Sequence, residues 1–162
     1  MIEITKARIE DAELVHKLAY EIWYPTYGDI LSKKQIDFML ENIYSIEALQ
    51  SSMRDKTSFY ILIEDGEASG FIGIEPKAGL LRIEKIYLLP STQGKGFGKK
   101  LIDFAAEEAK KQGLNELELN VNRGNNAYTF YLKQGFKVVE EVDIPYYEFV
   151  LNDYVMRKSL IS

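Results

Sequence analysis

Three glycines stand within five residues near the middle of the chain. The stretch QGKGFG places Gly94, Gly96 and Gly98 after an apolar run, IYLL, and before a segment whose apolar residues recur at helical spacing. Glycine reaches backbone conformations that other residues avoid, so successive N–H groups of such a loop can turn toward one anion. A helix that begins at the loop adds the partial positive charge of its N-terminus. The sequence therefore predicts a strand, an anion-binding loop and a helix, in this order.

Two well-known phosphate loops fit this stretch poorly. A Walker A loop needs Ser or Thr after Gly-Lys, but Lys100 follows Lys99 here. A dinucleotide-binding fingerprint accepts Gly94 and Gly96, but Lys99 stands where its third glycine belongs. A glycine-rich turn that binds no ligand is a further alternative, because short glycine motifs recur by chance.

The periodicity of apolar residues divides the chain into helices and strands. Helices are expected over 11–24, from Ser32 to about residue 43, from Ser45 to about Asp55, over 96–112 and over 125–134. Strands are expected over 2–8, in SFYILIE and GFIGIE on either side of Asp65-Gly66, over 80–89, in NELELNV, and in FKVVEEV and YYEFVLNDYVMRK. Ser32 and Ser45 are typical helix N-caps, and Pro25 with Gly28 should end the first helix.

This order of elements predicts one α+β domain with a mostly antiparallel sheet over residues 1–162. The net charge of −5 argues against nucleic-acid binding, which needs a basic surface. The chain has no cysteine and a single histidine, so a disulfide framework and a thiolate or multi-histidine metal site are not expected. No apolar run approaches the roughly 20 residues of a membrane span. The start of the sequence is charged rather than apolar, and we expect a soluble cytoplasmic protein.

The loop and its surroundings resemble the GNAT superfamily of N-acetyltransferases. QGKGFG is similar to the family's Gln/Arg-x-x-Gly-x-Gly/Ala loop, and LRIEKIYLL before it and NVNRGNNAYTFYLKQGF after it are similar to the flanking family segments. The resemblance runs from about Leu81 to Leu160 and is looser over the first half. RIEKIY and the aromatic C-terminal strand look closest to bacterial polyamine acetyltransferases of the spermidine type. The resemblance implies a single-domain GNAT fold with a mixed, mostly antiparallel sheet of about six or seven strands, flanked by helices.

The resemblance also implies that the anion is the pyrophosphate of acetyl-CoA, a co-substrate used without a metal. The residues that would bind it are Ile86, Tyr87, Leu88, Gln93, Gly94, Lys95, Gly96, Phe97, Gly98, Lys99, Asn125 and Lys133. The backbone of 86–88 would bond the pantetheine arm like an added strand, and an N–H near Leu88, where a bulge is expected, would donate to the oxyanion. The chain is shorter here than the common family spacing, so Asn122 or Asn126 could replace Asn125. Asn125 could equally do no more than cap its helix.

Two residues are candidates for proton transfer. Glu84, within RIEKIY, is the best candidate for the base that takes a proton from the amine, directly or through water. The alternative is an ordinary strand carboxylate paired with a basic neighbour. Tyr131 stands where the family carries its general acid, and a phenol of pKa near 10 stays protonated at neutral pH and can donate to the CoA thiolate. The alternative for Tyr131 is a core residue packed with Phe130 and Phe136.

The amine acceptor would meet aromatic residues at the end of the first predicted helix. YEIWYPTYGDI gathers Trp23, Tyr24 and Tyr27, where the family covers its acceptor cleft. Aromatic rings hold a cationic amine by cation–π attraction, about 0.5–2 kcal/mol for each ring. Carboxylates that could add to this site are Asp29 and, in the final hairpin, Asp143 or Glu148. The alternative is that these rings belong to the core or to an interface.

The predicted function is transfer of an acetyl group from acetyl-CoA to a primary amine, favouring a small amine or polyamine, by direct attack in a ternary complex. Two other functions remain open: a non-catalytic acyl-CoA-binding regulatory module, and an acetyltransferase that acts on the N-terminus or a lysine of a protein. The predicted partners are acetyl-CoA and the amine acceptor, with no nucleic acid and no membrane. The resemblance also implies a possible homodimer through the last strands.

Overall fold

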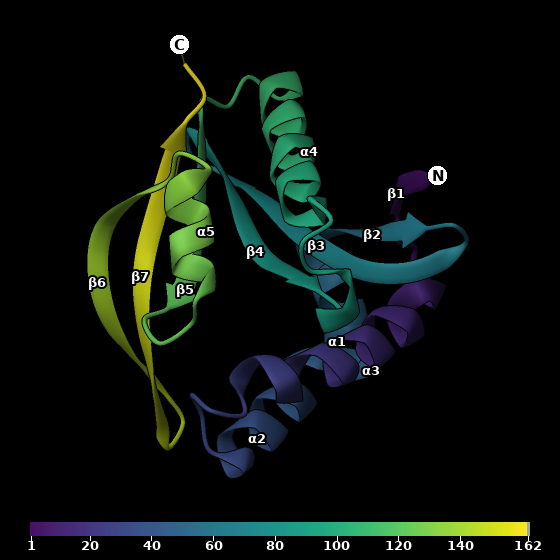
Figure 1. Cartoon of the computed structure of the whole chain (residues 1–162), viewed down its shortest axis with the longest axis vertical. Helices are drawn as coiled ribbons and strands as arrows, with labels where there is room; N and C mark the ends of the chain where they lie inside the picture. The colour runs from purple at the N-terminus through teal and green to yellow at the C-terminus, as the bar shows by residue number, and fades with distance from the viewer. Residues whose placement is uncertain (162) are drawn as a thin grey trace. The chain divides into compact units, whose positions relative to one another are not determined.

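A computed structural model describes residues 1–161, which form a seven-stranded sheet and five α-helices (Figure 1). The order of the strands in the sheet is β1-β2-β3-β4-β5-β7-β6. The pair β4–β5 is parallel, while β1–β2, β2–β3, β5–β7 and β6–β7 are antiparallel. The predicted α+β class and the mixed, mostly antiparallel sheet are therefore confirmed.

Contacts within the chain divide it into two compact units. The first unit holds Met1–Glu75 and Glu84–Leu101. The second unit holds Pro76–Ile83 and the chain from Ile102 onward. Strand β4 and helix α4 each contribute residues to both units, and each unit is described in turn.

The sheet of the first unit begins with an antiparallel hairpin. Strand β1 (Ile2–Lys6) pairs with β2 (Ser58–Glu64), and β2 pairs with β3 (Glu67–Lys77). Asp65 and Gly66 join β2 to β3 with φ angles of 49° and 86°. Two successive positive φ angles match the twist of the flanking strands, which is why Asp-Gly favours this turn. The predicted hairpin is confirmed.

Three helices of the first unit pack against one another: α1 (Ala12–Tyr27), α2 (Lys33–Tyr44) and α3 (Ile46–Asp55). A short 3-10 turn, η1 (Ile9–Asp11), precedes them. The Ser32 hydroxyl accepts the N–H of Gln35 at 3.1 Å, and the Ser45 hydroxyl accepts the N–H of Ala48 at 3.1 Å. Each bond satisfies a donor that the first turn of a helix leaves open. Both predicted N-caps are therefore confirmed.

The predicted end of the first helix at residue 24 is wrong, because α1 runs to Tyr27 with Pro25 inside it. Proline lacks an N–H group, so in the last turn it removes one helical hydrogen bond without stopping the chain. The helical pattern continues beyond the proline, since the N–H of Gly28 donates to the Tyr24 carbonyl at 2.9 Å. The extra turn keeps Tyr27 on the helix, four residues after Trp23.

Strand β3 comes unusually close to β4 (Leu80–Leu88) at Gly70. A Cβ atom on Gly70 would lie 2.5 Å from the carbonyl oxygen of Tyr87 and 3.2 Å from the Cα of Leu88. The Leu89 N–H donates to the Ser69 carbonyl at 2.9 Å. Glycine is required at residue 70 because the backbone of β4 occupies the space of a side chain.

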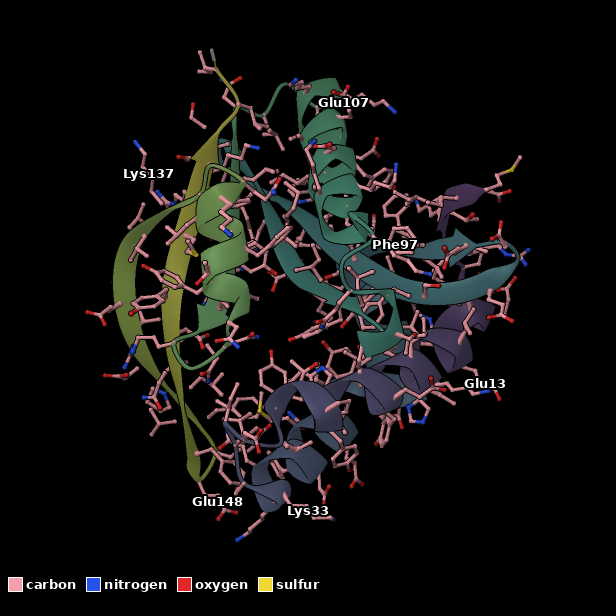
Figure 2. The ribbon with its side chains drawn as sticks, in the orientation of Figure 1. Glu13, Lys33, Phe97, Glu107, Lys137 and Glu148 are labelled. Carbon is pink, nitrogen blue, oxygen red and sulfur yellow. The ribbon has the colours of Figure 1, made fainter. Side chains whose placement is uncertain are left out.

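The second unit contains an antiparallel sheet extended by the first half of β4. Leu81–Ile83 of β4 pair with Leu117–Leu119 of β5 (Glu116–Asn122). β5 pairs with β7 (Phe149–Ser159), and β7 pairs with the edge strand β6 (Lys137–Tyr146). Figure 2 labels Lys137 and Glu148, which lie toward opposite ends of this β6–β7 hairpin.

Two helices complete the second unit: α5 (Ala127–Lys133), which contacts β5, and most of α4 (Phe97–Lys111) (Figure 1). Gly113 follows α4 with a φ of 72°, and the Leu114 N–H donates to the Ala109 carbonyl at 2.9 Å. Helices commonly end in this way, with a glycine of positive φ just after the last turn, as predicted for Gly113.

The alternation predicted for β5 is also observed. Leu117, Leu119 and Val121 are buried, and the residues between them are half-buried. On this polar face Glu118 accepts hydrogen bonds from Arg82 and Arg157, each at 2.8 Å. Burial alone would raise the pKa of Glu118, but the hydrogen bonds from the two guanidinium groups outweigh burial and lower it.

Candidate active site

The glycine loop has the backbone that the sequence predicts for an anion site. Gly94 and Gly96 have φ angles of 85° and 78°, which disfavour other residues. A Cβ atom on either glycine would meet no atom within 4 Å, so conformation rather than crowding requires glycine. Helix α4 begins at Phe97, and the Lys100 N–H donates to the Gly96 carbonyl at 3.2 Å. The loop thus leads directly into a helix N-terminus, where backbone N–H groups and the helix dipole favour an anion.

The approach to the loop is fixed by a short 3-10 turn, η2 (Pro90–Thr92). The hydroxyl of Thr92, which is buried, donates to the Leu89 carbonyl at 2.7 Å. Phe97, at the loop end of α4 (Figure 2), is 2% exposed, so its ring belongs to the core. Only the backbone N–H of Phe97 remains a candidate contact to a ligand.

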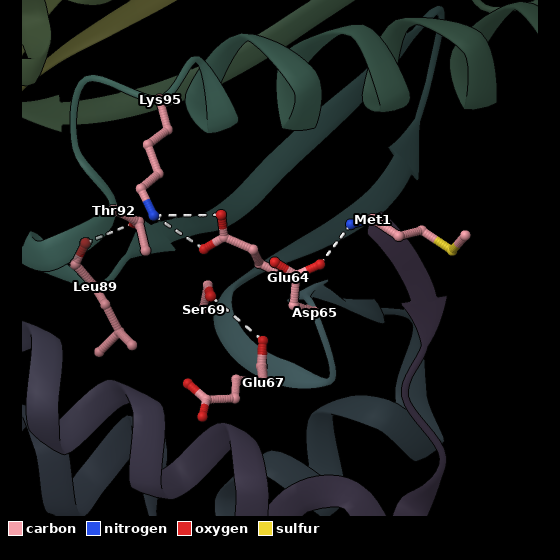
Figure 3. A network of polar contacts seen from close by, with 8 residues as sticks. All are labelled: Met1, Glu64, Asp65, Glu67, Ser69, Leu89, Thr92 and Lys95. Carbon is pink, nitrogen blue, oxygen red and sulfur yellow. Dashed lines mark hydrogen bonds and ion pairs between the residues drawn. The ribbon is translucent and has the colours of Figure 1, made fainter.

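Lys95 of the loop lies across the end of β2 (Figure 3). Its ammonium group lies 3.1 Å and 3.3 Å from the two carboxylate oxygens of Glu64, and 5.9 Å from the centre of the Phe97 ring. The side chain of Lys95 is 48% exposed, so this ion pair is open to solvent and weak, about 0–1 kcal/mol. A phosphate group at the loop would compete with Glu64 for the same ammonium.

The second half of β4 is the part of the chain predicted to hold the pantetheine arm. Leu81 and Ile83 are buried, but every residue from Glu84 to Leu88 is half-buried. A strand inside a sheet normally alternates or is buried on both faces. The loss of alternation after Ile83 shows that this segment, which includes Glu84, Ile86, Tyr87 and Leu88, keeps accessible surface.

Two of the three predicted aromatic acceptor residues lie together in a larger cluster of the first unit. The ring of Trp23 lies 4.6 Å from Tyr27, 5.4 Å from Tyr44 and 5.7 Å from Tyr87, between ring centres. The hydroxyls of Tyr27 and Tyr87 are hydrogen-bonded at 2.9 Å. Trp23 is 4% and Tyr27 7% exposed, so in this structure both rings are packed as core residues. Lys85 places its ammonium group 5.7 Å from the centre of the Tyr44 ring, which supplies the cluster with a cation.

The third predicted aromatic residue, Tyr24, lies outside this cluster. It is 37% exposed, and its hydroxyl donates to the Asp37 carboxylate at 2.5 Å. This hydrogen bond raises the pKa of Tyr24 to about 12. Asp37 also accepts from Lys33 at 2.7 Å. Tyr24 therefore joins α1 to α2, while Asp29, after the end of α1, is exposed.

In the second unit, Tyr131 lies on α5 and is 7% exposed. Its ring lies 5.4 Å from Phe130 and 5.8 Å from Phe136, as the core alternative predicts. These contacts orient the ring and do not conflict with a role for its hydroxyl. Lys133, further along α5, is exposed.

The asparagines before α5 shape the turn that starts this helix. The side-chain oxygen of Asn125 accepts the N–H of Ala127 at 2.9 Å, and that of Asn122 accepts the N–H of Gly124 at 2.8 Å. Asn126 is the N-cap residue and makes no side-chain capping bond. Asn125 thus has the capping role that the sequence left as an alternative, with its amide nitrogen still a possible donor to a ligand.

Two carboxylates of the final hairpin differ in their surroundings. Asp143 accepts from Asn152 at 2.8 Å and from Arg123 at 2.7 Å, and these hydrogen bonds lower the pKa of Asp143. Glu148 is exposed in the turn between β6 and β7. Asp143 is therefore already neutralised by a guanidinium group.

Sequence reasoning missed several polar and aromatic neighbours of the candidate residues. Tyr44 and Lys85 join the aromatic cluster through the fold, since nothing in the sequence near either residue indicates that it lies beside Trp23 and Tyr27. Asp153 and Asn120, on β7 and β5, are hydrogen-bonded at 3.2 Å. The register of β5 and β7, which places Asn122 opposite Asp153, brings this pair together. The sequence alone does not reveal this register.

Within residues 1–161 the structure contains no group of three or more His, Asp or Glu that could hold a metal ion. Over the same part of the chain, no helix has the length and apolar character needed to cross a membrane.

Comparisons with known proteins agree with this geometry. Residues 29–147 match the family model described as an acetyltransferase (GNAT) domain. The chain is 34% identical to spermidine N(1)-acetyltransferase of Thermoplasma acidophilum, over 99% of both chains, and 28% identical to aminoalkylphosphonate N-acetyltransferase of Salmonella typhimurium, over 83% of this chain and 84% of that protein. The crystal structure of PaiA N-acetyltransferase from Thermoplasma acidophilum in complex with coenzyme A superposes with a TM-score of 0.85, at 33% identity over 98% of this chain and 99% of that one. The chain therefore belongs to the GNAT family of N-acetyltransferases, which use acetyl-CoA as the acetyl donor.

Proposed function

We propose that the chain acetylates a primary amino group of a small di- or polyamine. The observation that carries this proposal is the 34% identity with a spermidine acetyltransferase over 99% of both chains. The net charge of −5 suits a cationic acceptor. A protein acceptor and a non-catalytic acyl-CoA module are the competing functions.

The glycine loop and its neighbours bind the acetyl donor, acetyl-CoA. Backbone N–H groups of 94–99 face the pyrophosphate, and the N-terminus of α4 adds positive charge. The backbone of 86–88 extends along the pantetheine arm, and an N–H near Leu88 donates to the oxyanion. Lys95 exchanges Glu64 for a phosphate oxygen. Asn125 and Lys133 are assigned donor contacts by their place in the family motif.

The acceptor must lose a proton before it can react. An alkylamine has a pKa of about 10.4, so at pH 7 roughly one molecule in 2,500 is neutral, a cost of about 4–5 kcal/mol. Glu84 takes this proton, directly or through water. The nitrogen lone pair attacks the thioester carbon, and the nitrogen, now positively charged, releases its second proton to water. The tetrahedral intermediate then collapses with cleavage of the C–S bond. Tyr131 donates its proton to the departing thiolate and is later reprotonated from solvent.

The acceptor is tested by thiol release from acetyl-CoA across a panel of spermidine, putrescine, butylamine and a peptide with a free N-terminus. We expect the highest kcat/KM for the amines with two or more charges. Faster turnover of the peptide would favour a protein acceptor. Tight acetyl-CoA binding in calorimetry without turnover of any acceptor would favour the non-catalytic module. Either result would overturn the proposal.

Tyr131→Phe should lower kcat by on the order of a hundredfold, because the phenyl ring keeps the packing but cannot donate a proton. The affinity for CoA in calorimetry should change little. Tyr128→Phe is the matched control on the same helix, since its ring stacks on Tyr154 at 4.8 Å and the proposal gives it no role. An unchanged kcat in Tyr131→Phe would remove this residue from the mechanism.

Glu84→Gln should lower kcat/KM by on the order of a hundredfold at pH 7. The defect should shrink as the pH rises toward 10, because solvent then deprotonates the amine without a base. The measurement is the ratio of variant to wild type across pH, with Glu116→Gln on β5 as the control. A ratio that stays constant with pH would assign Glu84 a structural role instead.

Glu64→Gln should tighten CoA binding by about two- to fivefold, because it frees Lys95 from an ion pair worth up to about 1 kcal/mol. Lys95→Met should weaken binding, and both effects should diminish at high salt. Calorimetry at two ionic strengths measures this, and Glu67→Gln, on the same hairpin (Figure 3), is the control of equal charge. Weaker binding in Glu64→Gln would show that Glu64 positions Lys95 rather than competing for it.

A further inference from the structure

A polar pair on β5 and β7 stands apart from the loop and the aromatic cluster. Asn120 alternates with the buried residues Leu119 and Val121, so its side chain lies on the polar face of β5. Asp153 lies opposite Asn122 in the ladder, on the same face. The amide nitrogen of Asn120 donates to a carboxylate oxygen of Asp153 at 3.2 Å.

The amide oxygen of Asn120 is buried and has no hydrogen-bond partner among the described residues. A buried acceptor without a donor costs about 1–3 kcal/mol. Turning the amide over would not help, because its oxygen would then face the carboxylate of Asp153, which also accepts. This oxygen therefore needs a donor from outside the chain.

The carboxylate of Asp153 also lacks a cation. In the part of the chain that the structure describes, its hydrogen-bond partner is Asn120, and no Lys or Arg lies within ion-pair distance. The guanidinium group of Arg123, the neighbouring cation, binds Asp143 at 2.7 Å and reaches only the main-chain carbonyl of Asp153, at 3.1 Å. The other two arginines on this face both bind Glu118.

Keeping a charge at Asp153 is costly. Burial raises the pKa of Asp153, and the hydrogen bond from Asn120 and the charges of Arg123 and Arg82 offset only part of this. A structural role alone would be served as well by a neutral side chain. A half-buried carboxylate beside an acceptor without a donor matches the needs of an ammonium group, which brings one positive charge and three N–H donors.

We propose that Asp153 and Asn120, both in the second unit, bind an ammonium group of a di- or polyamine, and so favour such amines over monoamines. Asp153 supplies the charge. The amide nitrogen of Asn120 positions that carboxylate, and its oxygen accepts a further hydrogen bond from the same ammonium. This subsite rests on the proposed function and assigns one charge of a di- or polyamine to named residues.

The test is Asp153→Asn, compared with wild type in two measurements. In the first, kcat/KM should fall about ten- to a hundredfold for spermidine and putrescine and remain nearly unchanged for butylamine, which has no second charge. In the second, calorimetry with CoA present should show spermidine binding weakened to the same extent. Asp153→Glu should restore part of both. Glu140→Gln is the matched control, because Glu140 is an exposed carboxylate opposite Val155 on the same ladder.

The outcomes separate this proposal from the proposed function. Equal losses for spermidine and butylamine, or no loss for either, would overturn the subsite while leaving acetylation of amines in place. Wild type that acetylates no amine would overturn the proposed function, and the binding measurement would still decide whether Asp153 holds spermidine. Unchanged spermidine binding in Asp153→Asn overturns the subsite in every case.

Asn120→Leu provides a second, independent variant. It removes an acceptor without a partner but also the hydrogen bond to Asp153, two opposing effects, and Leu keeps a similar shape, so the unfolding temperature should change little. Spermidine binding should nevertheless weaken severalfold, because Asp153 loses its positioning bond and the ammonium loses an acceptor. A folded variant with wild-type spermidine affinity would contradict the role of Asn120.

Discussion

The rest of the structure depends on a difference in pairing and burial between the two halves of strand β4. Its first half pairs with β5 and buries Leu81 and Ile83, as an interior strand should. Its second half, from Glu84 to Leu88, is half-buried throughout. A strand that was fully buried along its whole length would leave no surface for a substrate to contact. The first half of the strand thus contributes to the core, and the second half keeps the accessible surface that we propose for substrate binding.

The aromatic cluster illustrates a similar compromise. Trp23 and Tyr27 are so well packed that a substrate amine cannot lie against most of their surface without displacing a neighbour. Tyr87 is half-buried and belongs both to this cluster and to the accessible half of β4. The cluster therefore fixes the position of the accessible segment through Tyr87. The ammonium group of Lys85, in the same segment, lies over the rings of Tyr44 and Phe59.

Local signals in the sequence were sufficient for most elements of the fold. The Asp65-Gly66 turn, the two serine caps and the alternation in β5 depend on residues a few positions apart, and each is observed. The first helix is predicted too short because Pro25 with Gly28 is expected to end it, whereas a proline in the last turn of a helix removes a single hydrogen bond. The glycine loop was also predictable, since its positive φ angles require glycine at residues 94 and 96.

The candidate site was less predictable because its contacts join distant segments. Nothing near Lys95 indicates that Glu64, on β2, would hold its ammonium, and nothing near Asn120 indicates Asp153. The three aromatic residues look alike in the sequence, but their contacts differ: the Tyr24 hydroxyl donates to Asp37 on α2, while Trp23 and Tyr27, four residues apart and so close together around the helix, pack against each other in the cluster. Their difference became visible only when α2 was placed.

The close approach at Gly70 has a consequence for how the donor site can vary. The Tyr87 carbonyl lies where the side chain of residue 70 would begin, so even one methyl group there would push the backbone of β4. The position of this carbonyl is therefore set by β3, a strand to which we assign no contact with a substrate. Residue 70 therefore sets the separation of β3 and β4. A protein engineer could use it to shift the segment that we propose to bind the pantetheine arm without changing any residue of the proposed site.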